Sequence, residues 1–410
     1  MSRRFGLSAA VVFLILQGLD NLFFTILSTV ASVYAIVSAD LDPLELVLVG
    51  TVLEVTTLVF EVPTGVVADM VSRRLSIIVG VFLTGVGFVV WGSFPRFETI
   101  LAAQVMWAIG YTFTSGADVA WITDEVGEEA ARPLYLKAAQ VGQVGALVGI
   151  GVSVALASIA LWLPLVVSGV LFIGLAGFLV VAMPESNFQR VSREASPLVH
   201  FGATLRGGVG VVRARPALML IFAITAFQGA ASEGFDRLWT LHVIRSFAFP
   251  ALGDLEPVVW FGIIEAVGLV LSVGATEFIK RRGLAETAGG AARALAVVSG
   301  LLVASVLTFA LAGIFAVALI ALWSVSVLRE IQYPLYRTWI NAGLDSRTRA
   351  TVNSMGSQMD AFGQIAGGPV LGVLAAARGV RSAIAASGLI GAPGLLLFSR
   401  AIRADRVPSS

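Results

Sequence analysis

Residues 75–94 read LSIIVGVFLTGVGFVVWGSF, and no charged side chain interrupts them. A helix of about twenty residues has the length needed to cross the hydrocarbon core of a bilayer. The rest of the chain is similar, since 57% of its 410 residues are hydrophobic and only 13% are charged. A soluble domain carries about 25% charged residues. Lipid must therefore cover part of the apolar surface, and the sequence predicts an all-α membrane protein.

Apolar runs of comparable length recur twelve times, and we interpret each as a membrane-spanning helix. The most polar interval, 184–216, is interpreted as a linker between two six-helix halves, 1–183 and 217–410. This organisation predicts twelve helices in two pseudo-symmetric bundles around a central cavity. The predicted spans are 6–36, 43–69, 75–94, 98–123, 134–157, 162–183, 217–244, 257–279, 293–312, 314–340, 350–376 and 382–400.

The composition excludes several kinds of site. The chain has no cysteine, so disulfides and thiolate metal sites are excluded, and its two histidines are His200 and His242. No metal-ligand cluster, phosphate-binding glycine loop or nucleophile–base pair is recognisable, so we expect no cofactor, no metal and no enzymatic activity. A formal charge of +1 gives no indication of nucleic-acid binding. The expected partners are the lipid bilayer and a small-molecule substrate, and the expected state is a monomer.

Arginine and lysine are distributed unevenly between the two sides that the predicted spans define. With the N-terminus inside, only Arg96, Arg245, Arg378 and Arg381 fall on the outer side. Because cytoplasmic loops are enriched in these residues, the asymmetry predicts a multi-pass protein of the inner (cytoplasmic) membrane with both termini in the cytoplasm. The residues assigned to the cytoplasmic side are Arg3, Arg4, Arg73, Arg74, Arg132, Lys137, Arg190, Arg193, Arg206, Arg213, Arg215, Lys280, Arg281, Arg282, Arg293, Arg347, Arg349, Arg400, Arg403 and Arg406.

Four short sequence matches relate the two halves of the chain. The members of each pair are separated by about half of the chain, and the pairs occur in the same order in both halves. Such a repeat predicts two parallel six-helix units, an arrangement known in transporters. The pairs are Gln17-Gly18 with Gln228-Gly229, Asp69 and Arg73-Arg74 with Glu277 and Arg281-Arg282, Trp121-Ile122 with Trp339-Ile340, and Gly142-Gln143 with Gly363-Gln364.

Charged residues inside the predicted spans recur with a period of three helices. The third, sixth, ninth and twelfth spans carry no charge in their apolar cores, so we expect these four to face lipid. A charge at the bilayer centre costs roughly 2.5–3.5 kcal/mol, so eleven charges facing lipid would cost on the order of 30 kcal/mol. They must instead face protein or a water-filled cavity, or be protonated. The eleven are Asp20, Glu54, Glu61, Asp118, Glu233, Asp236, Arg237, Glu265, Arg329, Glu330 and Asp360.

Some of these charges are expected to form structural ion pairs. Arg237 is close in sequence to Asp236 and Glu233, and Arg329 is adjacent to Glu330. Nine carboxylates nevertheless face two arginines, so unpaired carboxylates remain to exchange protons or to attract a cationic substrate. The candidates for proton or substrate coupling are Asp20, Glu54, Glu233, Asp236, Arg237, Glu265, Arg329, Glu330 and Asp360.

Neutral polar and aromatic side chains at membrane depth form a second group of candidates. An amide at this depth either orients a substrate or hydrogen-bonds between helices, and an aromatic ring either stacks on a ligand or packs between helices. The sequence leaves both roles open. The candidates for lining a substrate site are Gln17, Gln143, Gln228, Gln364, Trp107, Tyr111 and Tyr333.

The segment that precedes the first quoted run, residues 61–74, reads EVPTGVVADMVSRR. It resembles the signature loop between the second and third helices of the major facilitator superfamily, which Gly65, Asp69, Arg73 and Arg74 match. The resemblance extends to the helix number, the linker position and the repeat, and it implies the twelve-helix fold of that superfamily. The start of the segment resembles a bacterial subgroup of permeases and drug exporters.

The resemblance implies that this loop switches the protein between conformations and makes no contact with substrate. The aspartate that matches the signature, Asp69, is thought to latch the two halves on the cytoplasmic side. Asp124 and Glu125 are expected to pair with Arg73 or Arg74. The candidates for this cytoplasmic gate are Glu61, Gly65, Asp69, Arg73, Arg74, Asp118, Asp124, Glu277 and Arg281.

Several positions depart from the pattern of proton-coupled drug exporters. Met70 replaces a basic residue of the signature loop, and Ser72 replaces a glycine. Met106 stands four residues before Gly110, where these exporters often carry an arginine. Their Gly-Pro pair is absent from the fifth span and occurs instead at Gly368-Pro369 in the eleventh.

These observations favour a secondary active transporter that works by alternating access. The acidic excess and the family resemblance favour proton-coupled export of a small amphipathic, cationic molecule, with the proton gradient as the energy source. Uptake or facilitated diffusion of a nutrient, such as a sugar or an organic acid, is an alternative that the glutamines and the missing exporter motifs fit. In that case Arg237 and Arg329 would hold an anionic substrate. Lipid translocation is a third alternative, which the sequence neither selects nor excludes.

Overall fold

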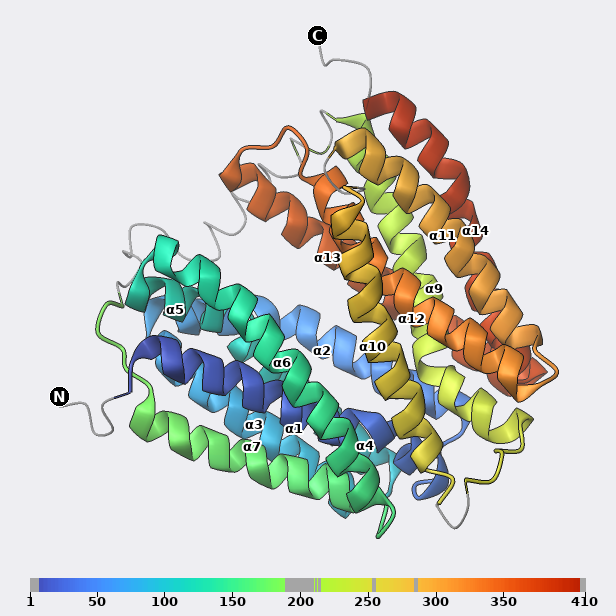
Figure 1. Cartoon of the computed structure of the whole chain (residues 1–410), viewed down its shortest axis with the longest axis horizontal. Helices are drawn as coiled ribbons and strands as arrows, with labels where there is room; N and C mark the ends of the chain where they lie inside the picture. The colour runs from blue at the N-terminus through green and yellow to red at the C-terminus, as the bar shows by residue number, and fades with distance from the viewer. Residues whose placement is uncertain are drawn as a thin grey trace. The chain divides into compact units, whose positions relative to one another are not determined.

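The computed structural model describes residues 7–188, 210, 212, 215–252, 256–283 and 287–405, apart from the side chains of residues 346, 347 and 405. The regular structure of these residues is α-helical, as Figure 1 shows, so the all-α prediction is confirmed. The helices are α1 (Ala9–Val37), α2 (Pro43–Met70), α3 (Arg73–Ser93), α4 (Phe97–Thr114), α5 (Ala117–Val126), α6 (Glu128–Ala157), α7 (Leu163–Ala182), α9 (Pro216–Ser246), α10 (Val259–Arg281), α11 (Ala288–Leu311), α12 (Phe315–Ile340), α13 (Ser346–Arg378) and α14 (Val380–Asp405).

The predicted spans agree with these helices to within a few residues, with one exception. Among the described residues, eleven helices are long and apolar enough to cross a membrane. The prediction of one continuous helix over 98–123 is wrong, because α4 ends at Thr114 and α5 begins at Ala117. These two helices together occupy the fourth span, so the order of twelve spans is retained. Most of the predicted linker, 184–216, lies outside the described residues, as do Arg3, Arg4, His200 and Arg406.

Two small residues, Ser115 and Gly116, set the break in the fourth span. Gly116 has a φ of 74°, in the left-handed region that glycine adopts without steric cost. Ser115 has a ψ of 115°, outside the helical range, although its amide still donates to the carbonyl oxygen of Tyr111. The chain therefore leaves one helix and begins another, which places Asp118 in the first turn of α5.

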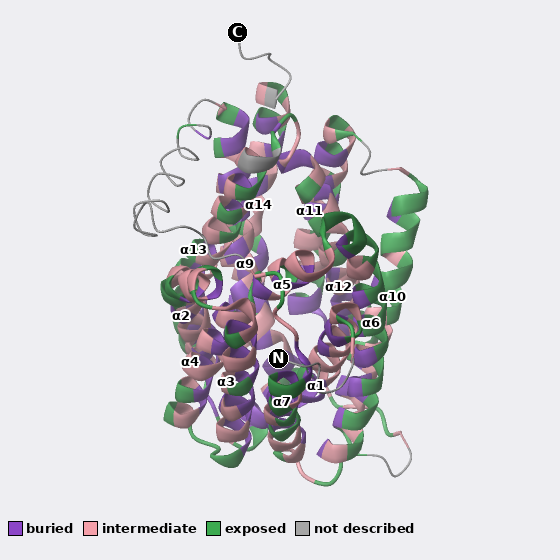
Figure 2. Ribbon diagram, turned by 90° about the vertical axis from the view of Figure 1, so that its left-hand side faces the viewer, coloured by how far each residue is buried: buried purple, intermediate pink, exposed green. Residues whose placement is uncertain are grey.

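Contacts between helices divide the chain into two compact units, each of which includes a short segment from the other half of the sequence. Within each unit, buried residues gather where neighbouring helices meet, and α10 carries many exposed residues (Figure 2). The sequence-based boundaries at 183 and 217 stay a prediction. Unit 1 comprises residues 1–41, 52–194 and 251–265, and unit 2 comprises residues 42–51, 195–250 and 266–410.

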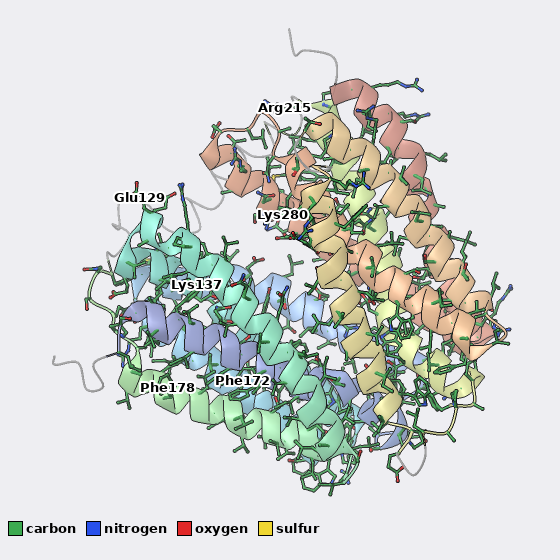
Figure 3. The ribbon with its side chains drawn as sticks, in the orientation of Figure 1. Glu129, Lys137, Phe172, Phe178, Arg215 and Lys280 are labelled. Atoms are coloured by element: carbon green, nitrogen blue, oxygen red, sulfur yellow. The ribbon has the colours of Figure 1, made fainter. Side chains whose placement is uncertain are left out.

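In unit 1, α1 packs against α6 and α7, and α3 packs against α4 and α7. Glycines permit the closest of these approaches. A Cβ on Gly145 of α6 would lie 2.5 Å from the carbonyl oxygen of Gly18, and a Cβ on Gly149 would lie 2.7 Å from that of Leu22. Phe172 of α7, labelled in Figure 3, packs edge-on against aromatic rings of α1 and α3. The contact between α1 and α6 fixes the rotation of α1 about its own axis.

In unit 2, α9 packs against α13 and α14, and α11 packs against α12 and α14. Here too glycines let two backbones touch. A Cβ on Gly363 of α13 would lie 2.1 Å from the carbonyl oxygen of Ala226, and a Cβ on Gly367 would lie 2.7 Å from the Cα of Ala230. The contact between α9 and α13 thus repeats the contact between α1 and α6. Arg215, just before α9, donates to a carbonyl oxygen of the turn after α12 at 3.2 Å (Figure 3).

Candidate functional site

Two aspartates of unit 1, Asp20 and Asp118, form what we call the acidic pair. Asp118 stands in the first turn of α5, where the helix N-terminus favours a negative charge. Its carboxylate accepts hydrogen bonds from Nε2 of Gln17 and from the amide of Val119, both at 2.7 Å. Asp20 lies on α1 and has the Asp118 carboxylate as a charged neighbour. The break in the fourth span therefore brings a second acid to the side of α1.

The packing of α1 directs Gln17 and Asp20 toward α5. Gly18 and Leu22 face α6, whereas residues three apart, such as Gln17 and Asp20, share the neighbouring helix face. Within the described residues, the carboxylate of Asp20 has no hydrogen bond and no ion pair. The acidic pair thus combines one carboxylate that is hydrogen-bonded with one whose charge has no partner.

Positive charges of unit 1 lie at or near the starts of helices. Arg73 opens α3, Arg96 precedes α4, and Arg132 and Lys137 belong to the first third of α6, where Figure 3 labels Lys137. In the described part of the chain, none of these four residues forms an ion pair with Asp20. Asp20 is therefore a carboxylate of unit 1 without a counter-charge among the described residues.

Three of the residues predicted for the gate, Asp69, Arg73 and Asp124, form a cluster that we call the loop cluster. Arg73 forms an ion pair with Asp124 and a longer one, at 3.7 Å, with Asp69. Its guanidinium also donates to the carbonyl oxygen of Ala120 at 2.8 Å. The expected pairing of Asp124 with Arg73 is confirmed. The same expectation for Glu125 is wrong, because its carboxylate accepts hydrogen bonds from two backbone amides after α7.

Changing Asp124 to asparagine is expected to lower the stability of the purified protein by about 1.5–3 kcal/mol, the range for hydrogen bonds to charged groups. The reason is that the Arg73 side chain is only 16% exposed, so water replaces the lost carboxylate poorly. The thermal midpoint of unfolding measures this effect.

A matched control is Glu128→Gln on α6. Glu128 pairs with Arg132 at 3.0 Å, but the two side chains are 77% and 72% exposed, so we expect no measurable change in the midpoint. Equal midpoints for the two variants would show that the loop cluster contributes no stability.

Unit 2 pairs Arg237 and Arg329, which lie in the apolar cores of their spans, with carboxylates of α9. Arg237 binds Glu233 one turn earlier, with 3.0 Å between Nε and Oε1. Arg329 of α12 binds Asp236. The expected pairing of Arg329 with Glu330 is wrong, because adjacent residues on a helix do not face each other, and Glu330 is exposed.

The start of α2 belongs to unit 2 and lies against the first of these ion pairs. A Cβ on Gly50 would lie 2.0 Å from Oε1 of Glu233 and 2.1 Å from Nε of Arg237. Glu233 is only 1% exposed, so α2 helps to enclose a charged pair. Gly50 was not among the candidates from the sequence, because a glycine within an apolar run gives no signal beyond helix packing.

A cavity of about 340 Å³ lies in unit 2 among α9, α11, α12, α13 and α14, and we call it the C-terminal pocket. Gln228 and Gln332 both donate to Oγ of Ser299, at 3.2 and 3.0 Å. Gln364 donates to Asp360 at 2.8 Å. These five residues form the polar wall of the pocket. The other lining residues are Ile224, Ala231, Ser232, Asp236, Leu302, Val303, Val306, Arg329, Ser387, Gly388, Gly391, Gly394 and Phe398.

Four polar residues of the pocket were not predicted from the sequence: Ser232, Ser299, Gln332 and Ser387. Ser299 and Ser387 lie in the ninth and twelfth spans, whose uncharged apolar cores predict helices that face lipid. The available signal was a lone hydroxyl inside a long apolar run, because a buried hydroxyl requires a hydrogen-bond partner on a neighbouring helix or on a ligand.

The remaining candidates are spread over both units. Trp107 packs with rings of Phe24, Phe88 and Trp91. The hydroxyl of Tyr333, on α12, accepts hydrogen bonds from Arg337. Asp118, expected in the gate, belongs to the acidic pair instead. Glu61, Tyr111, Gln143, Glu265, Glu277 and Arg281 are exposed, with Glu277 and Arg281 paired at 2.7 Å, while Glu54, Gly65 and Arg74 are half-buried.

Membrane-length helices that carry internal carboxylates, buried ion pairs and a polar pocket define a polytopic membrane transporter. The sequence matches the Major Facilitator Superfamily over residues 12–359, and the chain belongs to this family. It is therefore a transporter of that superfamily and not an enzyme.

Known proteins agree with this assignment. The uncharacterized MFS-type transporter YxaM of Bacillus subtilis is 24% identical over 379 residues, which are 90% of each chain. A mutant of the nucleoside transporter NupG has a TM-score of 0.79 at 13% identity, covering 96% of this chain and 100% of its own. An inward-facing bacterial homologue of the human lysosomal transporter Spinster has a TM-score of 0.74 at 15% identity, covering 97% and 96%. These structures show a shared fold.

Proposed function

We propose that this transporter uses the proton gradient to export small amphipathic cations by alternating access. It acts in the inner (cytoplasmic) membrane with both termini in the cytoplasm, which the distribution of arginine and lysine supports. The resemblance of residues 61–74 to the signature loop of permeases and drug exporters supports the direction of transport.

The observation that carries this proposal is the acidic pair. Asp118 is held by Gln17 and by a backbone amide, whereas Asp20 lacks a counter-charge among the described residues. An ionised carboxylate at membrane depth is costly, so a proton neutralises Asp20 while the group is enclosed in the membrane. Binding of this proton on one side and its release on the other is the coupling step of the proton–cation exchange that we propose.

Proteoliposomes that contain the purified chain and the aromatic cation ethidium test the proposal. We expect ethidium efflux to accelerate when a pH gradient is imposed and to fall to the leak rate when an ionophore dissipates the gradient. Protein-free liposomes of the same lipid give the leak rate. Efflux that is the same with and without the gradient would contradict proton coupling.

Uptake of an uncharged polar nutrient is a second candidate, which the amides of the C-terminal pocket favour. Gln228, Gln332 and Gln364 present neutral hydrogen-bonding groups of the kind that bind hydroxyl-rich molecules. Labelled uridine is a suitable probe, since nucleosides are named as the substrate of NupG. Accumulation of uridine inside the proteoliposomes, without ethidium movement, would favour this candidate over cation export.

A further inference from the structure

We infer that the C-terminal pocket binds the ammonium group of a small primary or secondary amine inside unit 2. The inference rests on the proposed function, because it takes the transported molecule to be a cation. It names the chemical class of that cation and assigns its recognition to unit 2, while proton coupling stays with the acidic pair of unit 1.

Hydrogen-bond acceptors outnumber donors on the polar wall of the pocket. Gln228 and Gln332 each commit an amide hydrogen to Ser299, and Gln364 commits one to Asp360. Within the described residues, the three amide oxygens accept no hydrogen bond, and each offers two lone pairs against one remaining amide hydrogen. Asp360 adds a second carboxylate oxygen. A ligand that satisfies this wall must donate hydrogen bonds.

The pocket also carries an excess of negative charge. Arg329 is paired with Asp236, which leaves no arginine or lysine in an ion pair with Asp360 among the described residues. The charged groups that line the cavity are these three, two acidic and one basic. A ligand with a single positive charge balances them, and an ammonium group with N–H donors meets both requirements.

The apolar lining limits the apolar part of the ligand. Leu302, Val303 and Val306 share a face of α11 with Ser299 and continue the lining of the pocket with apolar side chains. A volume of about 340 Å³ is at the small end of ligand pockets, which span roughly 300–1,000 Å³. One aromatic ring on a short alkyl chain fits this space, whereas a lipid with two acyl chains does not.

Two matched probes separate hydrogen-bond donation from charge: 2-phenylethylammonium and its N,N,N-trimethyl analogue. Both carry one positive charge, but the trimethyl form has no N–H to donate. We expect the primary amine to bind the purified protein at least about tenfold more tightly, as measured by calorimetry. Equal affinities, or tighter binding of uncharged uridine, would overturn the inference.

A substitution that fills the pocket locates the binding. A Cβ on Gly394 of α14 would lie 3.9 Å from Ile224 and Phe227, an ordinary contact, so the side chain of Gly394→Leu extends into the cavity without displacing backbone. We expect this variant to bind 2-phenylethylammonium at least about tenfold more weakly. The matched control is Gly274→Leu on α10, where nothing lies within 4 Å of a Cβ, and its affinity should equal that of the wild type.

A second variant keeps the test decisive if Gly394→Leu fails to fold. Gln332→Leu preserves the size of the side chain and removes one free amide oxygen, so we expect roughly fivefold weaker binding of the primary amine. Unchanged affinity in either folded variant would exclude the pocket as the site. Binding is measured without a gradient, so this failure is separate from a failure of proton-coupled ethidium efflux.

Discussion

Replacing Asp20 by asparagine is expected to uncouple cation export from the proton gradient. Asparagine has the shape of a protonated aspartate, but it neither releases a proton nor gains a charge. Gradient-driven ethidium export in proteoliposomes should therefore fall by about tenfold or more, a typical size for the coupling between two ligands. Exchange of labelled for unlabelled ethidium at equal pH on both sides should continue, because it requires no proton transfer.

The control for this prediction is Glu98→Gln. Glu98 is an exposed carboxylate in the first turn of α4, outside the acidic pair, and its replacement should leave gradient-driven export unchanged. If Asp20→Asn exports ethidium at the wild-type rate under the same gradient, the proton is carried by another group and the role of the acidic pair is disproved.

Replacing Gly363 by alanine is expected to give the largest loss of stability of any single methyl group added to α13. The new Cβ would lie 2.1 Å from the carbonyl oxygen of Ala226, which belongs to the backbone of α9 and has no room to move aside. Overpacking of this kind costs about 1–3 kcal/mol. The thermal midpoint of the purified protein should fall accordingly, since the contact between α9 and α13 is among the closest in unit 2.

The same substitution at Gly274 of α10 provides the contrast. Nothing lies within 4 Å of a Cβ at that position, and alanine favours the helix over glycine by up to about 1 kcal/mol. Gly274→Ala should therefore leave the midpoint unchanged or raise it. A midpoint for Gly363→Ala equal to that of Gly274→Ala would mean that the two backbones are not in contact.

Most of the fold could be predicted from hydropathy, because a bilayer leaves few choices for the backbone. Each spanning segment must satisfy its own hydrogen bonds, so a long apolar run becomes a helix. The break at Ser115 and Gly116 could not be predicted in this way. Hydropathy is averaged over a window that is much longer than two residues, and two small residues barely change the average.

The candidate site was predicted in part, and the failures share a cause. Glu233 and Arg237 are one turn apart on a single helix, so spacing alone suggested their ion pair. Arg329 and Asp236 lie on different helices, and nothing in the sequence reports how two helices are rotated toward each other. The grouping of Asp118 with Asp20 depends in addition on the break, which was not predicted from the sequence.

The close contacts of glycine explain why the sequence repeat is visible at all. The pair Gly142-Gln143 and Gly363-Gln364 belongs to the two helices, α6 and α13, that press against α1 and α9 respectively. No larger residue fits at Gly363, so the glycine has no substitute, whereas the surrounding apolar positions accept many side chains of similar volume. Sequence matches between the two halves are therefore retained where two helix backbones touch and are lost at other positions.

The break between α4 and α5 has a mechanical consequence. An unbroken helix transmits a displacement along its axis from one end to the other. Gly116 interrupts the helix between α4 and α5, and a glycine has more backbone freedom than any other residue. Residues of this kind serve as hinges in proteins that change conformation. α4 is held by the rings around Trp107, whereas α5 is held by the contacts of Asp124 and Ala120 with Arg73. The two ends of one membrane span are therefore anchored separately.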